Sequence, residues 1–167
     1  MNSTRFRLLL LLLACTSTTI VGAALALQHY ERLAPCPLCI LQRYGFLWMG
    51  LFAFVAAALG PGSGARVMAG VGALGGFAGF AVAVKHVWVL YHPAISCGID
   101  PVENFVNALP MAQWLPAVFY ANGDCSAELP AILGLQIPVW SMLWLFTLAT
   151  CLALFALRRV RRAAAWA

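Results

Sequence analysis

Two of the six cysteines stand close together in a chain that is otherwise strongly apolar. Cys36 and Cys39 belong to the stretch 34–46, APCPLCILQRYGF, where a long hydrophobic run begins. A disulfide closed over two intervening residues removes little chain entropy, so it contributes little as a structural crosslink. The C-x-x-C spacing is better suited to thiols that open and close repeatedly, each closure releasing two electrons and two protons. This spacing therefore predicts a redox centre.

The residues around this pair favour a reactive thiolate. Pro37 has a fixed φ and no N–H, which suits the first turn of a helix, so we expect Cys36 at the N-cap. The free N–H groups and the positive dipole end of that helix would then favour a thiolate over a thiol. Arg43 follows Cys39 by four residues on the same helical face, inside an apolar run where a charge is costly. We interpret Arg43 as holding a thiolate and an electron acceptor; the alternative is a guanidinium that reaches out to lipid headgroups.

The other four cysteines fall into two kinds. Cys97 and Cys125 lie in the longest mixed segment, and taken alone they favour a structural disulfide that stabilises the fold by about 3–4 kcal/mol. Cys15 and Cys151 lie within apolar runs, where a thiol stays protonated and serves as a small packing residue. From the residues alone we therefore expect a structural Cys97–Cys125 disulfide, and a redox-active one is the alternative.

A metal site is the competing interpretation of the same residues. Four cysteines and three histidines could be drawn as a soft-metal cage formed by Cys36, Cys39, Cys97, Cys125, His29, His86 and His92. Structural zinc sites usually combine a C-x-x-C with a second close pair, whereas Cys97 and Cys125 are far apart in sequence, so no metal is predicted. The sequence also has no glycine-rich nucleotide fingerprint and no haem-attachment C-x-x-C-H. The acceptor that fits is a lipid-soluble two-electron carrier, which is a quinone.

Composition indicates where these residues must be placed. The chain is 63% hydrophobic and only 9% charged, too few polar residues to cover a water-soluble globule of 167 residues. Four apolar windows approach the length of about 20 residues that a membrane helix needs, namely 8–27, 41–59, 67–84 and 139–157. They are joined by 28–40, a turn at 60–66 and a long segment at 86–138. We predict one integral membrane domain, 1–167.

The first window has a second interpretation. Basic residues before a leucine run resemble a cleavable signal, and the residues before Cys15 loosely resemble a lipoprotein site. The apolar stretch is longer than the core of about 7–15 residues usual in a signal peptide. We therefore expect this segment to be retained as a transmembrane helix.

Basic and acidic residues predict the orientation. Basic residues stay in the cytoplasm. One side of the four windows carries Arg5, Arg7, Arg66, Arg158, Arg159, Arg161 and Arg162, and the other carries Glu31, Asp100, Glu103, Asp124 and Glu128. Both termini are therefore expected in the cytoplasm and the cysteine-bearing loops in the periplasm. The net charge of +5 is then a topology signal, and no nucleic-acid partner is predicted.

These features together resemble one family, the bacterial inner-membrane thiol oxidases called disulfide bond formation protein B, or DsbB. The resemblance covers nearly the whole chain in order: four spans, PCPLCILQR with Arg43, KHVWVLYHPAISC ending at Cys97, and WLPAVFYANGDC ending at Cys125. It implies an all-α integral membrane protein, an antiparallel four-helix transmembrane bundle with two periplasmic loops. The glycines at 72, 75, 76 and 79 would let helices of such a bundle approach closely.

The resemblance also implies a mechanism. A periplasmic thioredoxin-fold oxidase of the DsbA type would attack Cys97 of a Cys97–Cys125 disulfide, and the freed Cys125 would attack Cys36 and release Cys39. Electrons would then pass to a quinone of the surrounding membrane lipid, ubiquinone being favoured over menaquinone, with Arg43 promoting quinone binding.

Other expectations leave alternatives open. His86 aligns with a histidine near the quinone in this family; the alternative is an interfacial residue satisfied by water or headgroups. Trp114, Phe119 and Tyr120 suit a short segment that lies on the membrane. The alternatives for the whole protein are a relative of DsbB with a dedicated partner, and a membrane scaffold or metal-handling protein with structural disulfides.

Overall fold

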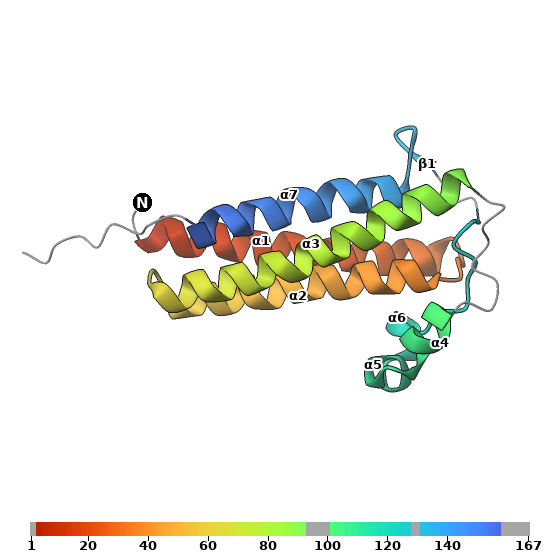
Figure 1. The fold of residues 1–167 in the computed structure, drawn as a ribbon, viewed down its shortest axis with the longest axis horizontal. Coiled ribbons are helices and arrows are strands. Elements are labelled where there is room, and N and C mark those ends of the chain that lie inside the picture. Colours follow the sequence, from red (N-terminus) through yellow and green to blue (C-terminus); the bar gives the residue numbers. More distant parts are fainter. Residues whose placement is uncertain (1–2, 93–100, 128–130, 158–167) are drawn as a thin grey trace, which may run out of the picture.

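Four long helices lie side by side and form the body of the protein (Figure 1). The computed structural model describes residues 3–92, 101–127 and 131–157. The long helices are α1 (Ser3–Tyr30), α2 (Pro37–Leu59), α3 (Ser63–Tyr91) and α7 (Ile137–Leu157). All four are long and apolar enough to cross a membrane. The predicted all-α four-helix bundle is confirmed.

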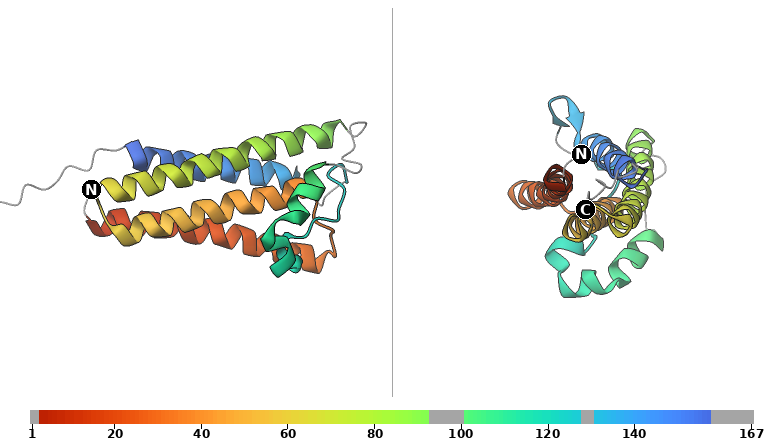
Figure 2. Two further views of the ribbon diagram at one scale, coloured as in Figure 1. Left: turned by 60° about the horizontal axis from the view of Figure 1, so that its bottom comes forward. Right: turned by 90° about the vertical axis from the view of Figure 1, so that its left-hand side faces the viewer.

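Short elements between α3 and α7 gather at one end of this bundle (Figure 1). They are α4 (Pro101–Ala108), α5 (Pro110–Trp114), α6 (Pro116–Phe119) and a two-stranded antiparallel hairpin of β1 (Ala131–Ile132) and β2 (Leu135–Gln136). In the view along the bundle, α4–α6 lie beside α2 (Figure 2). The N-terminus of α1 lies at the opposite end of the bundle (Figure 1).

The long helices extend beyond the apolar windows of the sequence. The second helix already begins at Pro37, and the third continues to Tyr91. Hydrophobicity marks only the part of a helix that lipid would surround, whereas the backbone hydrogen bonds continue into its polar ends. Cys36, Cys39 and His86, which the apolar windows leave in loops, therefore stand on helix ends.

Glycines set the distance between α2 and α3, as predicted. A Cβ at Gly76 would lie 2.8 Å from the Ala149 Cβ of α7, and a Cβ at Gly45 would lie 3.0 Å from the Gly79 Cα. Contacts this short leave no room for a side chain, so backbones approach closely at these positions. Two helices, α2 and α7, thereby pack tightly against the glycine face of α3.

The first helix packs on α2 through a narrow face. Phe6, Leu10 and Ser17 on this face are buried, and the Ser17 Oγ donates to the Phe46 carbonyl at 2.6 Å. Cys15 instead lies on the exposed surface of α1, so the prediction that it is a packing residue is wrong. The apolar window alone could not tell the packed face of α1 from its outer face, because it is apolar on both.

The segment α4–α6 packs against the start of α2 through a small apolar cluster. Ile40, Val106 and Phe119 are buried in it, and the Phe119 ring stacks on Tyr44 with centroids 4.8 Å apart. Phe119 therefore packs on α2 and does not present its ring outward, and the prediction that this segment lies on the membrane stays a prediction. Trp114, by contrast, is 73% exposed, so its indole remains available to a membrane surface.

Candidate functional site

Cys36 occupies the N-cap of α2, as the sequence predicts. Its backbone is extended, its Sγ accepts a hydrogen bond from the Cys39 N–H at 3.3 Å, and Pro37 opens the helix. The sulfur of an N-cap cysteine thus satisfies one of the free N–H groups of the first turn. The positive end of the helix dipole faces the cysteine pair, which favours negative charge there.

The two sulfurs of the C-x-x-C pair lie 3.0 Å apart as thiols. Cys36 is 3% exposed, whereas Cys39, one turn further along α2, is half-buried. The Cys36 sulfur is therefore shielded by protein, whereas the Cys39 sulfur borders open space. This asymmetry assigns different surroundings to two residues that the motif alone treats alike.

His86 reaches this pair from α3 and is 1% exposed. Its Nε2 lies 3.6 Å from the Cys36 Sγ, and its Nδ1 lies 4.0 Å from the Cys39 Sγ and 3.0 Å from the Gln42 Nε2. The alternative of an interfacial residue satisfied by headgroups is therefore wrong. The sequence analysis did not identify Gln42 as the partner of His86. A polar amide in an apolar run, one turn after Cys39, could have indicated it.

Cys125 comes to the same place from the long segment. It is 1% exposed and packs in one cluster with Cys36 and Val89. Hydrogen bonding with the Cys125 thiol, then with the Cys39 thiol, and burial raise the pKa of Cys36 well above its ordinary value, so the predicted preference for a thiolate is wrong for Cys36. Cys97 lies outside the described residues, so its pairing with Cys125 stays a prediction.

Backbone contacts hold the Cys125 segment against the start of α2. The N–H groups of Asn122 and Gly123 both donate to the Pro35 carbonyl at 3.1 Å. A Cβ at Gly123 would lie only 2.1 Å from the Ala34 carbonyl oxygen. Glycine is therefore required for this close approach, and the sequence analysis did not identify it.

Arg43 is buried, with 7% of its surface exposed. Its Nη1 donates to the Val118 carbonyl of α6 at 2.6 Å, and its Nη2 donates to the Gln28 Oε1 of α1. Both partners are neutral protein groups. The alternative that Arg43 reaches out to lipid headgroups is therefore wrong, and Gln28 is a second residue that the sequence analysis missed.

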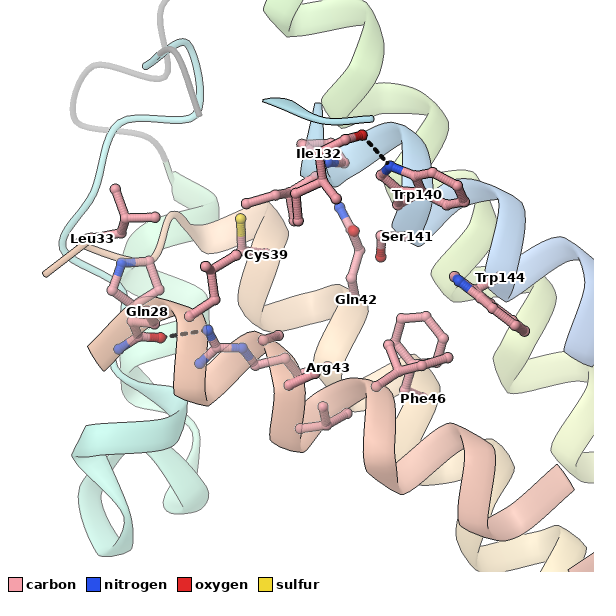
Figure 3. A pocket seen from close by; sticks show the side chains of 18 of the residues that line it. Gln28, Leu33, Cys39, Gln42, Arg43, Phe46, Ile132, Trp140, Ser141 and Trp144 are labelled. Carbon is pink, nitrogen blue, oxygen red and sulfur yellow. Dashed lines mark hydrogen bonds between the residues drawn. The ribbon is translucent and has the colours of Figure 1, made fainter. Parts of the chain in front are cut away.

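A cavity of about 550 Å³ opens between α1, α2 and α7 beside these residues. Figure 3 shows Cys39, Gln42 and Arg43 on the α2 side, with Trp140 and Trp144 of α7 across from them. The remaining lining is largely apolar, and Ile132 and Leu133 of the hairpin border it near Trp140, whose Nε1 donates to the Ile132 carbonyl at 2.9 Å. An apolar cavity with a few convergent polar groups is typical of a small-molecule site.

Cys36, Cys39 and His86 also form a group that could hold a metal ion, with ligand atoms within 4.8 Å of one another. In a tetrahedral zinc thiolate site two sulfurs at 2.3 Å from the metal would be about 3.8 Å apart, wider than the 3.0 Å between these two. His29 and His92 are exposed. Of the larger set of metal ligands considered from the sequence, the described part of the chain thus brings only His86 next to Cys36 and Cys39.

Comparison with known proteins decides between these chemistries. Residues 6–155 match the family model described as disulfide bond formation protein DsbB. The chain belongs to the DsbB family. Among its relatives named disulfide bond formation protein B, one from Ralstonia nicotianae is 49% identical over 93% of this chain and 97% of its own length. Another from Cupriavidus necator is 50% identical over 89% of this chain and 91% of its own, and one from Burkholderia pseudomallei is 38% identical over 92% and 91%.

Membership in the DsbB family indicates what the cysteine site does. The chain is a multi-pass membrane protein and a thiol oxidase of disulfide bond formation. A C-x-x-C pair on a helix end suits such an oxidoreductase, because its two thiols lie close enough to close to a disulfide and to open again. A membrane scaffold or metal-handling protein is not favoured.

Proposed function

We propose that this protein reoxidises a periplasmic dithiol oxidase of the DsbA type and passes the electrons to a membrane quinone. One observation carries the proposal. Cys39 contacts the Cys36 sulfur and also borders an apolar cavity that Arg43 helps to line. A carrier dissolved in lipid and a thiol at a helix end could meet there. We further propose that the cysteine-bearing end faces the periplasm and both termini face the cytoplasm.

The residues of the cavity suit a quinone. Its apolar walls match a prenylated ring, and the Arg43 guanidinium and the Gln42 amide are donors suited to the carbonyl oxygens of such a ring. When bound, a quinone supplies an acceptor for two electrons and two protons. Fixing a positive guanidinium in this apolar site favours negative charge that develops during the transfer.

Electrons enter by thiol–disulfide exchange. A thiolate of the partner attacks Cys97 of a Cys97–Cys125 disulfide, forming a mixed disulfide and releasing Cys125 as a thiolate. Cys125 then attacks Cys36 of a Cys36–Cys39 disulfide and releases Cys39. The packing of Cys125 against Cys36 supports this step, because an attacking sulfur must lie next to the sulfur it attacks.

The cycle closes with a balanced transfer. The second thiol of the partner attacks the mixed disulfide, so that the partner leaves oxidised and Cys97 becomes a thiolate. Cys97 attacks Cys125 in the Cys36–Cys125 disulfide, which restores the Cys97–Cys125 disulfide and releases Cys36. Closure of the Cys36–Cys39 disulfide then releases two electrons and two protons, which a quinone bound in the cavity would accept. His86, beside the two sulfurs, can hold a proton at Nε2 next to Cys36.

Purified protein in detergent tests the proposal. Reduced DsbA-type partner is mixed with ubiquinone or, in parallel, menaquinone, and quinone absorbance is followed. We expect turnover with ubiquinone, none after Cys36→Ser or Cys39→Ser, and a raised quinone requirement after Arg43→His. Oxidation of the partner by the Cys97→Ser protein at the wild-type rate would refute the proposed electron route. Oxidation without any quinone would refute the proposed acceptor.

A further inference from the structure

Arg43 connects the cavity to the segment that carries Cys125. Its guanidinium lies between two elements, with Gln28 of α1 on one side and the Val118 carbonyl of α6 on the other. Figure 3 shows the contact between Gln28 and Arg43 at the edge of the cavity that Cys39 borders. The Arg43 side chain of α2 thus joins two elements, α1 and α6, that are far apart in sequence.

Two neutral hydrogen bonds set the position of this buried cation. Arginine is long and flexible, and where its charge rests depends on the groups that hold its planar fork. Hydrogen bonds to a charged group stabilise more than those between neutral groups, and leaving a buried charged donor without its acceptor is costly. Removing the Gln28 acceptor would therefore free the guanidinium to rotate away from Cys39.

Gln28 stands at a boundary between two cavities. It lines the apolar cavity together with Cys39 and Arg43, and it also lines a more polar cavity of about 750 Å³ beside Tyr120 and Asn122. Leu33–Pro35 also border both spaces. The amide is therefore placed where the redox end of α2 meets the segment that leads to Cys125.

The second contact of Arg43 reaches that segment directly. Val118 belongs to α6, and the chain after α6 is held by the Asn122 and Gly123 N–H groups on the Pro35 carbonyl before it reaches Cys125. The stretch from Val118 to Gly123 is thus held at both ends. Arg43 of α2 binds its first residue, and Pro35, just before α2, binds its last two residues. Loosening Arg43 removes one of these two fastenings.

We propose that Gln28 is a positioning residue of the thiol oxidase: it holds Arg43 across to α6, which keeps the guanidinium at the cavity and keeps Cys125 docked on Cys36. The inference rests on the proposed quinone-linked function for its first consequence. Its second consequence, the docking of Cys125, concerns thiol chemistry alone. The two consequences call for two separate measurements.

The first measurement is the quinone dependence of turnover. In Gln28→Leu protein we expect the KM for ubiquinone to rise about tenfold, the loss expected for one charged hydrogen bond, with kcat within about twofold of wild type. Gln113→Leu is the matched control, because Gln113 is exposed on α5. A KM equal to that of the control would overturn the positioning role, since a residue that only supports the fold would not change KM separately from kcat.

The second measurement needs no quinone. In a Cys39→Ser, Cys97→Ser background the loops retain Cys36 and Cys125, and a mild soluble oxidant should join them. We expect Gln28→Leu to slow this crosslinking about tenfold, and Gln28→Glu, which keeps an acceptor for Arg43, to restore most of the rate. Equal rates in all three proteins, or a Glu variant as slow as Leu, would overturn the proposal.

These two results also separate this inference from the proposed function. If the crosslinking rates change as expected but the protein with all its cysteines does not reduce ubiquinone, the proposed acceptor is refuted and the docking role of Gln28 stands. Should Gln28→Leu fail to fold, Gln28→Asn provides the same test, because its amide is one methylene too short to reach the guanidinium.

Discussion

Gln42 and His86 form a side-chain pair at 3.0 Å between α2 and α3, and both residues are buried. The Gln42 Nε2 is a donor, so the His86 Nδ1 must accept and the ring proton of a neutral imidazole resides on Nε2. That Nε2 lies 3.6 Å from the Cys36 Sγ. The amide therefore decides which nitrogen of the imidazole presents a proton to the cysteine pair.

Gln42→Glu should reverse this tautomer. A carboxylate only accepts hydrogen bonds, so His86 would have to donate from Nδ1 and would present a bare Nε2 to Cys36. Nitrogen-15 chemical shifts of His86 in labelled protein distinguish the two tautomers. Gln113→Glu adds the same charge at an exposed position and should leave the His86 shifts unchanged. An unchanged tautomer in the Gln42 variant would contradict the assigned role of the amide.

Gly123→Ala should displace Cys125 from Cys36. The added Cβ would lie 2.1 Å from the Ala34 carbonyl oxygen, which is backbone and cannot move aside cheaply. Overpacking of this kind costs about 1–3 kcal/mol, so crosslinking of Cys36 with Cys125 should slow by about tenfold. Gly22→Ala is the control, since a Cβ at Gly22 meets nothing within 4 Å. A rate equal to that of the control would show that the close approach is not needed.

Local features of the site could be predicted from the sequence. Pro37 and the first turn of α2 place Cys36 at the N-cap, and helical spacing places Arg43 one turn beyond Cys39. These relationships depend on residues within one helix end, where dipole and periodicity apply directly. The same holds for the four spans, because hydrophobic length is a property of each segment alone.

Pairings between helices could not be predicted in this way. Gln42 with His86, and Arg43 with Gln28 and the Val118 carbonyl, join residues on different elements, and nothing in an apolar pattern fixes how two such helices rotate against each other. A purely apolar helix has no polar face to orient it. Its rotation is decided by small residues and a few polar contacts, which a single sequence does not pair.

Gly76→Ala should destabilise the bundle, and no cysteine is among the nearest neighbours of the added Cβ. The new Cβ would meet the Met49 Sδ at 2.3 Å and the Ala149 Cβ at 2.8 Å, so the Met49 side chain must shift and α3 must move away from Ala149 of α7. We expect a loss of about 1–3 kcal/mol, seen as a lower Tm in detergent. Gly70→Ala provides the control because its Cβ would meet only the Ala156 Cβ, at 3.7 Å. Equal Tm values for the two variants would contradict the close packing of α3.

The reactivity of Cys36 should depend on pH in a way that Cys125 controls. Hydrogen bonding with the Cys125 thiol is the largest cause that raises the pKa of Cys36, followed by the Cys39 thiol and burial. A thiol with a raised pKa stays protonated as the pH passes its ordinary value. The stability that the neutral thiol contributes to the reduced fold is therefore complete below that ordinary value and is lost as the pH rises through the raised one.

Alkylation of the reduced protein, with peptide mapping to identify Cys36, measures this shift. The half-maximal rate at Cys36 should fall at a higher pH than for the same cysteine in denatured protein, because only the thiolate reacts. Cys125→Ala should move the curve toward lower pH, whereas Cys151→Ala in α7 should not move it. If Cys125→Ala left the curve in place, the two sulfurs would not be in contact in the reduced protein, and direct attack of Cys125 on Cys36 would require a prior movement of the segment.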